Sequence, residues 1–259
     1  MFPGIAQIRE APPSAFSIRI ERPILHIIGV SHFAHLVKIE QTEHTDRQKE
    51  LLSYLVSIVS QVKPALVGEE ASAEGLADHK LFSITQTSIK HLKSDIEYRF
   101  CDPTETQRKS IGYVSGFALF QHFVMSGDNN VSTSENHLKA YAIDIGTYFP
   151  ARERFWLKQL AGCNDKSAIF ICGYGHLAHN SFSKLLNQAG IDFKIEREDV
   201  GLSEEERKDV QRTLGYLKEH PELEHWTSPF SRLRITTTFD ALKCATRVRK
   251  RAPRPERTP

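Results

Sequence analysis

A seven-residue pattern that could carry out acid–base or metal chemistry occurs twice in this chain. Glycine, histidine, alanine and histidine recur in the same register, as G-x-x-H-x-A-H, at residues 29–35 and again at residues 173–179. Each copy follows a short apolar run, and an apolar run that ends at a glycine is typical of a buried strand. In an open α/β sheet, ligands bind where strands end and the chain turns into the next helix. The repeat therefore predicts that His32 and His176 belong to one site.

The repeat also has a plainer interpretation. The glycines could only make tight turns, and His32 and His176 could be polar surface residues at helix N-termini. Four identities that recur behind the same kind of apolar run favour the site. His35 and His179 follow three residues later, where a helix would place them on the same face as the first histidines. One imidazole at each strand end already suffices, so the second histidines are secondary candidates.

Carboxylates follow two further predicted strands. Residues 65–68 form a short apolar strand that ends in Glu69 and Glu70. Because successive strand residues face opposite ways, only one of these two side chains should point into the site. Residues 96–101 form another strand, which ends in Asp102. The proline, threonine and glutamate that follow make a capping-box pattern, so Asp102 could equally be a helix N-cap.

Two arginines stand where the sequence predicts the start of a helix over residues 151–160. Arg152 and Arg154 are out of place there, because the N-terminal end of a helix favours negative charge. Residues that break a local rule are candidates for a role elsewhere, here the binding of an anionic ligand or of the strand-end carboxylates. The alternative is an exposed basic face paired with Glu153.

The order of the remaining elements predicts the fold class. Apolar residues at helical spacing predict a helix over residues 44–63, which Pro64 stops. Further predicted elements are helices within 76–92 and over 106–125, 138–145, 177–189 and 203–220, a strand over 191–195, and a loop over 127–136. We expect an α/β fold with a mixed or largely parallel sheet, built from two related βαβ-containing halves and flanked by helices.

This pattern gives one main domain. We expect an N-terminal arm over residues 1–22, a single α/β domain over 23–225 and a C-terminal extension over 226–259 with a basic, disordered tail. The halves of the domain are expected at about residues 23–126 and 137–200.

Composition indicates the class of protein more than its partner. A chain of 259 residues buries roughly three quarters of its unfolded surface, enough for a large core. The net charge of +2 points to no particular partner, and four cysteines without C-x-x-C spacing are expected to be buried free thiols. No apolar run is long enough for a signal peptide or a membrane span. We expect a cytoplasmic protein with no membrane span, and no nucleic-acid binding beyond weak tail electrostatics.

The motifs together resemble the TIKI/TraB superfamily, which includes erythromycin esterase-like proteins and ChaN-like haem-uptake proteins. A typical member has a G-x-x-H after its first strand, a proline, an apolar strand and a glutamate, an aspartate followed by Thr-x-Arg, an Arg-acid-Arg helix start and a second G-x-x-H. The similar segments here are residues 29–32, 64–70, Asp102 with Thr106 and Arg108, 152–154 and 173–176. Order and spacing agree over residues 24–196. Trp156, Leu157 and Gln159 depart from the Met-Ala and Asn that esterase-like members often have.

The resemblance implies an α/β fold of two related halves, with His32, Glu70 and His176 converging on one cleft. Members include a metal-dependent peptidase, a lactone-hydrolysing esterase and a haem-binding protein, so one chemistry is not fixed. We expect a hydrolase that acts on an ester, lactone or peptide bond of a small-molecule or peptide substrate. Arg152 and Arg154 complete the expected catalytic set. The secondary candidates are Glu69, Asp102, Arg108, His35 and His179.

Two hydrolytic mechanisms fit these residues. In the metal-dependent version, His32, His176 and Glu70 bind a divalent ion such as Mn, Co or Zn, which lowers the pKa of its bound water to about 7. In the metal-free version, one histidine removes a proton from water while Glu70 orients the other imidazole. Arg152 or Arg154 would then stabilise the oxyanion or hold an acidic substrate group. No serine or cysteine lies in a nucleophile-elbow pattern, which argues against an acyl-enzyme.

A binding protein is the rival class. The histidines could ligate haem iron, with Arg152, Arg154 and Arg108 pairing the propionates. A catalytically inactive regulatory or interaction domain is a third interpretation. Haem absorbance would favour the binding protein, and turnover of ester, lactone or peptide libraries would favour the hydrolase.

Overall fold

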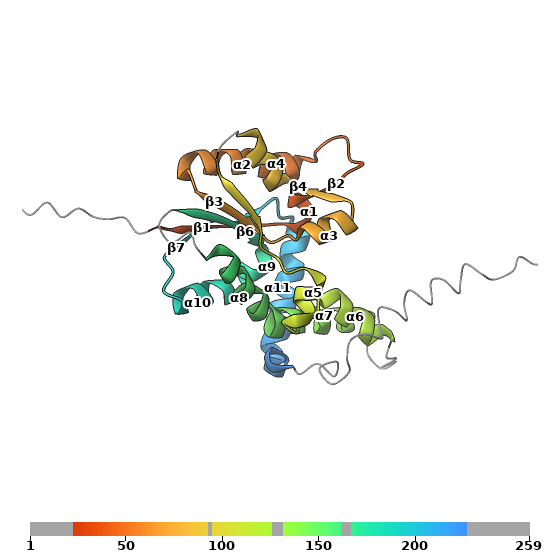
Figure 1. The fold of residues 1–259 in the computed structure, drawn as a ribbon. Coiled ribbons are helices and arrows are strands. Elements are labelled where there is room, and N and C mark those ends of the chain that lie inside the picture. The colour runs from red at the N-terminus through yellow and green to blue at the C-terminus, as the bar shows by residue number, and fades with distance from the viewer. Residues whose placement is uncertain (1–22, 93–94, 126–131, 162–166, 227–259) are drawn as a thin grey trace, which may run out of the picture.

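A five-stranded parallel sheet forms the centre of the computed structural model, which describes residues 23–92, 95–125, 132–161 and 167–226 (Figure 1). Its strands are β1 (Leu25–Val30), β3 (Leu66–Glu69), β5 (Glu97–Phe100), β6 (Ala168–Gly173) and β7 (Phe193–Val200). They lie in the order β5-β3-β6-β1-β7, and every pairing is parallel. The expected α/β class is confirmed. The second half of the sequence supplies β6, which lies between the first-half strands β3 and β1, so the two halves interleave in one sheet.

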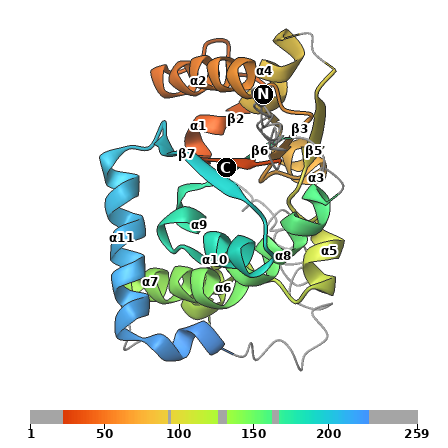
Figure 2. The same cartoon turned by 90° about the vertical axis from the view of Figure 1, so that its left-hand side faces the viewer.

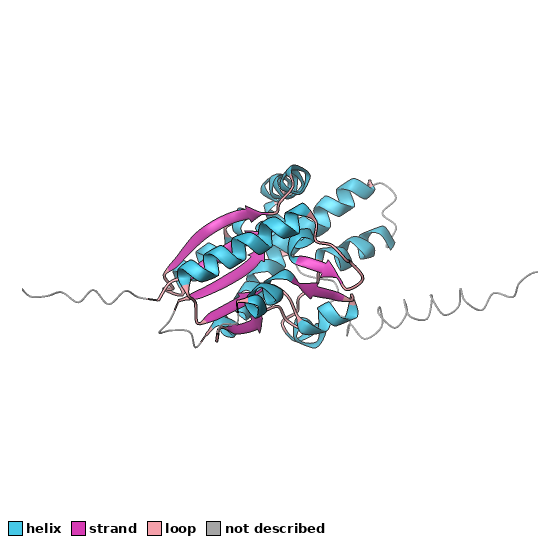
Figure 3. Ribbon diagram, turned by 90° about the horizontal axis from the view of Figure 1, so that it is seen from above, coloured by secondary structure: helices cyan, strands magenta, loops and turns pink. Residues whose placement is uncertain are grey.

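Helices cover both faces of this sheet (Figures 1 and 3). On one face lie α2 (Asp46–Val62) and α4 (Ile84–His91), and on the other lie α8 (Phe149–Leu160) and α10 (Ser181–Gln188). Neighbouring residues of β1 show the consequence: Ile28 packs into the first layer and Ile27 into the second, and both are fully buried. A parallel strand buried on both faces is a continuous apolar run, and this is why the sequence indicated strands here.

A third group of helices lies beyond the second face of the sheet. It consists of α6 (Gly116–Met125), α7 (Thr133–Ile143) and α11 (Glu204–Glu219), with its own apolar cluster around Leu119, Ile143 and Leu217. Figure 2 shows α11 running along one side of the molecule, from the end of β7 to these helices. The short elements are α1 (His32–His35), α3 (Ala73–Asp78), α5 (Glu105–Ser110), α9 (Tyr174–Ala178), a 3-10 turn (Pro221–His225) and an antiparallel pair, β2 (Leu36–Lys38) with β4 (Leu81–Ser83).

Several predicted boundaries are wrong. The helix expected over residues 106–125 is two helices, α5 and α6, because the chain turns at Gly112, whose φ is +69°. The loop expected over 127–136 is partly helical, since α7 begins at Thr133. The expected strand over 191–195 begins and ends later, as β7. The predicted arm, residues 1–22, and nearly all of the C-terminal extension lie outside the described residues.

The helix that carries the two arginines does not begin where the sequence predicted. The backbone stays helical from α7 through a π-helical turn, Asp144–Tyr148, and directly into α8. Arg152 therefore lies well inside a continuous helix, and the argument from the helix N-terminus does not apply to it.

Two further predictions can be compared with the structure. Cys101 and Cys172 are buried free thiols, as expected. Among the described helices, none has the length and apolarity to cross a bilayer.

Candidate active site

The two copies of the repeated pattern meet because their strands are neighbours. β1 and β6 pair in parallel, with Val30 opposite Gly173, so α1 and α9 begin side by side at the carboxyl edge of the sheet. β3 is the other neighbour of β6 and ends at the same edge. Glu70, the residue after β3, places its Oε1 atom 3.8 Å from His32 Nε2 and 3.5 Å from His176 Nε2. We call these three residues the His–Glu site.

Glu70 is the fixed centre of the His–Glu site. Its side chain is 1% exposed. Its Oε1 atom accepts a hydrogen bond from Arg152 Nη2 at 2.6 Å, and its Oε2 atom accepts one from the Gly173 N–H at 2.6 Å. Burial by itself would raise the pKa of this carboxyl, but Arg152, His176 and His32 together hold it well below its ordinary value. Glu70 is therefore a permanent negative charge that can orient an imidazole.

Asp102 orients Arg152 instead of capping a helix. Its Oδ1 atom accepts hydrogen bonds from Arg152 Nε at 2.9 Å and Nη2 at 2.7 Å, and its Oδ2 atom accepts one from Arg108 at 2.6 Å. The N-cap of α5 is Thr104, which forms a capping box with Gln107. The capping box in the sequence was thus real but displaced by two residues, and the predicted cap role of Asp102 is wrong.

His176 is held by Glu153, which entered the sequence-based predictions only as the partner of an exposed basic face in the alternative for the two arginines. Its Nδ1 atom lies 2.8 Å from Glu153 Oε1, and both side chains are 1% exposed. The His176 ring also stacks on Phe149, with ring centroids 3.6 Å apart and planes 16° apart. Burial would lower the pKa of His176, but Glu70 and Glu153 raise it above its ordinary value. No signal in the sequence marked Glu153, because only the packing of α8 decides which residues of the helix face inward. Glu153 is buried there, and its neighbour Arg154 is exposed.

Arg154 does not join the His–Glu site. It is exposed and lines a separate groove with His179 and Lys184. His179 is partly buried in this groove, and burial lowers its pKa. The structure thus brings Arg152 together with the His–Glu site and leaves Arg154 and His179 outside it.

Glu69 and His35 form a separate buried pair on the other side of the strand end. The carboxylate of Glu69 accepts hydrogen bonds from Ser83 at 2.6 and 2.9 Å and from Thr85 and Tyr98, and it lies 3.8 Å from His35 Nε2. Burial raises the pKa of Glu69 to about 7 and lowers that of His35 to about 4. Only Glu70 faces the His–Glu site, as the alternation of strand side chains predicted.

A cavity of about 370 Å³ opens beside the His–Glu site. The strand-edge residues that line it include His32, Glu70 and His176, and α7, α8 and α11 close it from the other side. His32 reaches it most openly, since its side chain is 56% exposed. Ser31 and Glu206, which also line the cavity, are hydrogen-bonded to each other and to Arg47, and they hold α11 beside the cavity. Ser31, Arg47 and Glu206 are far apart in the sequence, so their spacing could not have predicted this contact.

The π turn decides which side chains of the long helix reach this cavity. Asp144 and Arg152, both of which line it, are eight positions apart in the chain. In a regular α-helix that spacing leaves two side chains about 80° apart around the axis. A π turn takes up one extra residue, which rotates the following segment back by roughly 80–100° and brings the two side chains toward the same side.

The donors of the His–Glu site fit a divalent metal poorly. Both oxygens of Glu70 already accept hydrogen bonds, and the guanidinium of Arg152 on Oε1 repels a cation. The raised pKa of His176 favours the imidazolium form, which has no lone pair to bind a metal. Glu153 on Nδ1 is the one feature that metal-binding histidines share. Among the residues that the structure describes, no three His, Cys, Asp or Glu side chains are grouped to hold a metal ion.

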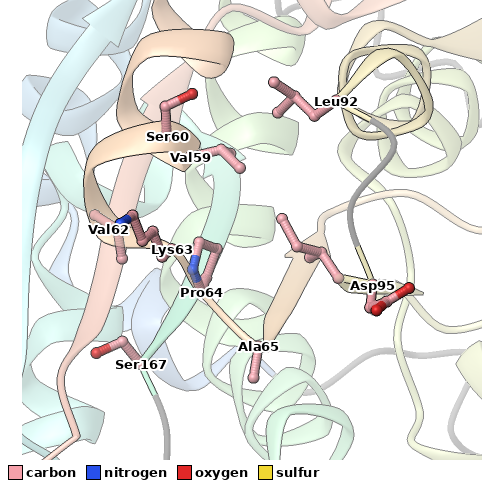
Figure 4. Close-up of a pocket in the computed structure, with 10 residues that line it drawn as sticks. Val59, Ser60, Val62, Lys63, Pro64, Ala65, Leu92, Asp95 and Ser167 are labelled. Carbon is pink, nitrogen blue, oxygen red and sulfur yellow. The ribbon is translucent and has the colours of Figure 1, made fainter.

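A larger cavity, about 790 Å³, lies at the opposite edge of the sheet (Figure 4). It is lined by residues that precede β3, β5 and β6, among them Pro64, Asp95 and Ser167. None of the candidate site residues from the sequence lines it. Since ligands in parallel sheets bind at the carboxyl edge, the smaller cavity is the candidate active site.

Comparison with protein-family models, with curated proteins and with solved structures found no significant match to this chain. The resemblance to the TIKI/TraB superfamily stays a prediction from the sequence motifs. The functional argument therefore depends on the geometry of the site.

Proposed function

We propose that this chain is a hydrolase that uses His32 as a general base, without a metal, to cleave an ester, lactone or peptide bond. One observation carries the proposal. His32 Nε2 lies 3.8 Å from a carboxylate that is buried and held ionised, while the imidazole itself is 56% exposed at the cavity. Of the three residues of the His–Glu site, His32 alone is open to both water and a substrate.

Each neighbour of His32 has a distinct task in this mechanism. The His32 imidazole removes a proton from a water molecule through Nδ1, because Nε2 is the nitrogen turned toward Glu70. The water oxygen then attacks the carbonyl carbon of the substrate. Glu70 orients the ring and stabilises the imidazolium that forms. Arg152 keeps Glu70 ionised and in place, because it bridges Glu70 and Asp102. Arg152 is thus a positioning residue.

His176 is the group best suited to stabilise the developing oxyanion. Its Nε2 atom is buried 3.5 Å from Glu70 Oε1, makes no hydrogen bond within the described part of the chain, and belongs to a ring that lines the cavity. Glu153 fixes the ring through Nδ1, and the raised pKa favours a proton on Nε2. A fixed donor aimed at developing negative charge is usually a large part of catalysis of acyl transfer.

The test is turnover of a panel of esters, lactones and peptides by the wild-type protein and by His32→Gln. We expect the substitution to lower kcat/KM roughly 10²- to 10⁴-fold, the usual contribution of a general base. Stability should hardly change, because His32 is exposed. His79→Gln, at an exposed histidine outside the site, is the matched control and should retain full activity. A wild-type protein inactive on the whole panel, or a His32→Gln variant as active as wild type, would contradict the proposal.

The metal-dependent version is distinguished by elemental mass spectrometry of freshly purified protein. The metal-free mechanism predicts less than stoichiometric Mn, Co or Zn, and activity that survives chelator treatment. Near-stoichiometric metal that is lost in both His32→Ala and His176→Ala would replace this mechanism with the metal-dependent one.

The haem-binding alternative has less support. Arg152 is buried and pairs with both Glu70 and Asp102, and Arg108 also pairs with Asp102, so a propionate would have to compete with these carboxylates. Arg154, the third arginine expected for that role, lines another groove. A Soret band on titration with haemin, lost in His32→Gln, would restore this alternative.

A further inference from the structure

Asp144 is a carboxyl group of the cavity wall to which the proposed mechanism gives no role. Its side chain lies on the π turn, and the residue is 8% exposed. One oxygen, Oδ2, accepts a hydrogen bond from the Gly116 N–H at 2.8 Å. The other, Oδ1, is buried and has no hydrogen-bond partner among the residues that the structure describes. A buried carboxyl oxygen without a partner is costly, so this atom is a candidate to meet a substrate.

The other carboxylates that line the cavity each have a cationic partner. Glu70 pairs with Arg152, Glu206 with Arg47 and Asp209 with Arg212. Within the described part of the chain, no such ion pair involves Asp144. A buried carboxyl outside any ion pair holds its proton more tightly than an exposed one, and a protonated carboxyl is a hydrogen-bond and proton donor.

We propose that Asp144 is the general acid of this site and donates its proton to the leaving group of the substrate. The inference rests on the hydrolase proposed above. His32 enters the cavity from the sheet edge and Asp144 from the long helix that closes it, so one group can act on the water and the other on the leaving atom. The extra residue of the π turn gives Asp144 this position on the same side of the helix as Arg152.

The surroundings of Asp144 are consistent with a proton donor. Burial raises its pKa to about 6, although Arg152, the Gly116 N–H and His176 act in the opposite direction and Glu70 raises it further. Burial raises the pKa of Tyr113 and of Tyr141, and the charge of Asp144 raises both further. The remaining titratable groups of the cavity wall are His32, His137, Tyr174, Glu206 and Asp209.

The proton and electron balance closes with water as the second reactant. Water gives a proton to His32 Nδ1, and its oxygen forms a bond to the carbonyl carbon, which places the carbonyl electron pair on oxygen. When the carbonyl re-forms, the bond to the leaving oxygen or nitrogen breaks, and the leaving atom takes the proton of Asp144. The imidazolium of His32 then returns a proton to Asp144 through solvent.

The experiment compares two leaving groups on one acyl group. Ethyl butyrate leaves as an alkoxide that needs a proton, whereas p-nitrophenyl butyrate leaves as a stabilised phenolate that does not. For Asp144→Asn we expect kcat on the ethyl ester to fall about 100-fold or more, with only a few-fold change on the p-nitrophenyl ester. The decrease in ethyl-ester turnover above about pH 6, which ionisation of Asp144 causes, should disappear in the variant.

Stability supplies a readout that does not depend on turnover. Asparagine preserves the acceptor for the Gly116 N–H and removes the buried charge. The midpoint of urea unfolding of Asp144→Asn should therefore equal or exceed that of the wild-type protein at about pH 8.

The outcomes separate this inference from the proposed function. If the wild-type protein hydrolyses neither ester nor any member of the panel, the hydrolase fails and the inference falls with it. Equal losses on the two esters, in a variant that is folded, would overturn the role of Asp144 alone. A variant that keeps its kcat and loses affinity only for amine-bearing substrates would likewise overturn it, since Asp144 would then bind a cation.

Discussion

His32 Nε2 lies so close to the backbone of Gly173 that a methyl group on this glycine would come within 2.6 Å of it. The histidine of the first repeated pattern therefore rests on the glycine of the second. Both patterns need the glycine for close approach, since a methyl group on Gly29 would meet the Glu198 carbonyl oxygen of β7 at 2.1 Å. Each glycine of the repeat is thus required where its strand end lies against a neighbouring segment: Gly173 against His32, and Gly29 against β7.

This contact predicts a loss of activity without a loss of fold. In Gly173→Ala the methyl group displaces the exposed His32 ring from Glu70, so kcat should fall at least about 10-fold, part of the contribution of a general base. The φ of Gly173 is −62°, which alanine adopts without strain. Gly175→Ala is the matched control, because its methyl group would meet only Phe149 at 3.6 Å, an ordinary contact. Turnover and thermal unfolding of both variants check this, and equal activities would contradict it.

The two arginines of α8 should differ strongly in their effect on stability. Arg152→Gln leaves Glu70 and Asp102 buried without their shared cation, and removing one partner of a buried ion pair typically costs about 3–5 kcal/mol. Arg154→Gln should change the free energy of unfolding by less than about 0.5 kcal/mol, because Arg154 is exposed. Urea unfolding near neutral pH measures both values. Similar losses in the two variants would mean that Arg154 has a structural role.

Glu153→Gln should lower the pKa of His176. The substitution removes the negative charge 2.8 Å from Nδ1 that favours the imidazolium form. The raised folded-state pKa contributes stability that is complete below about pH 6.5 and is lost as the pH rises through the folded value, so the variant should lose stability mainly at acid pH. NMR titration of the imidazole measures the shift. Ser181→Ala, which keeps the charge of Glu153 and removes only its hydroxyl donor, is the control and should leave the imidazolium favoured.

The stability of Glu69→Gln relative to that of the wild-type protein should increase as the pH rises. The pKa of Glu69 is about 7 in the folded chain against 4.5 as its reference value, so the wild-type protein loses stability between these pH values. The loss is up to about 3 kcal/mol by linkage. Urea unfolding of both proteins at about pH 5 and pH 8 should show a stability difference that shifts in favour of the variant at the higher pH.

Two comparisons make this measurement specific to Glu69. His35 acts in the opposite direction, since its lowered pKa costs stability as the pH falls from 6.5 to about 4, and taking the difference between variant and wild type cancels its share to first order. Glu97→Gln, at an exposed carboxylate, should show no comparable shift. Parallel pH profiles for wild type and Glu69→Gln would mean that Glu69 is ionised throughout.

The sequence by itself determined the local parts of the site. Buried parallel strands are continuous apolar runs, so β1, β3 and β6 could be recognised, and the residues at their carboxyl ends, His32, Glu70 and His176, followed from that. The alternation of side chains along a strand also indicated that only one of Glu69 and Glu70 would face the site. These features depend on periods of two residues and on glycines, which the chain carries locally.

The tertiary structure alone decided how these parts combine. The insertion of β6 between β3 and β1 set the neighbours of Glu70, and the π turn rotated α8 so that Arg152 and Glu153 face inward while Arg154 faces solvent. Asp144 entered the cavity for the same reason. Strand order and helix rotation result from packing between elements far apart in the chain. The residue spacing within one segment cannot predict strand order or helix rotation. Its apolar residues recur with the same period whichever element the segment packs against.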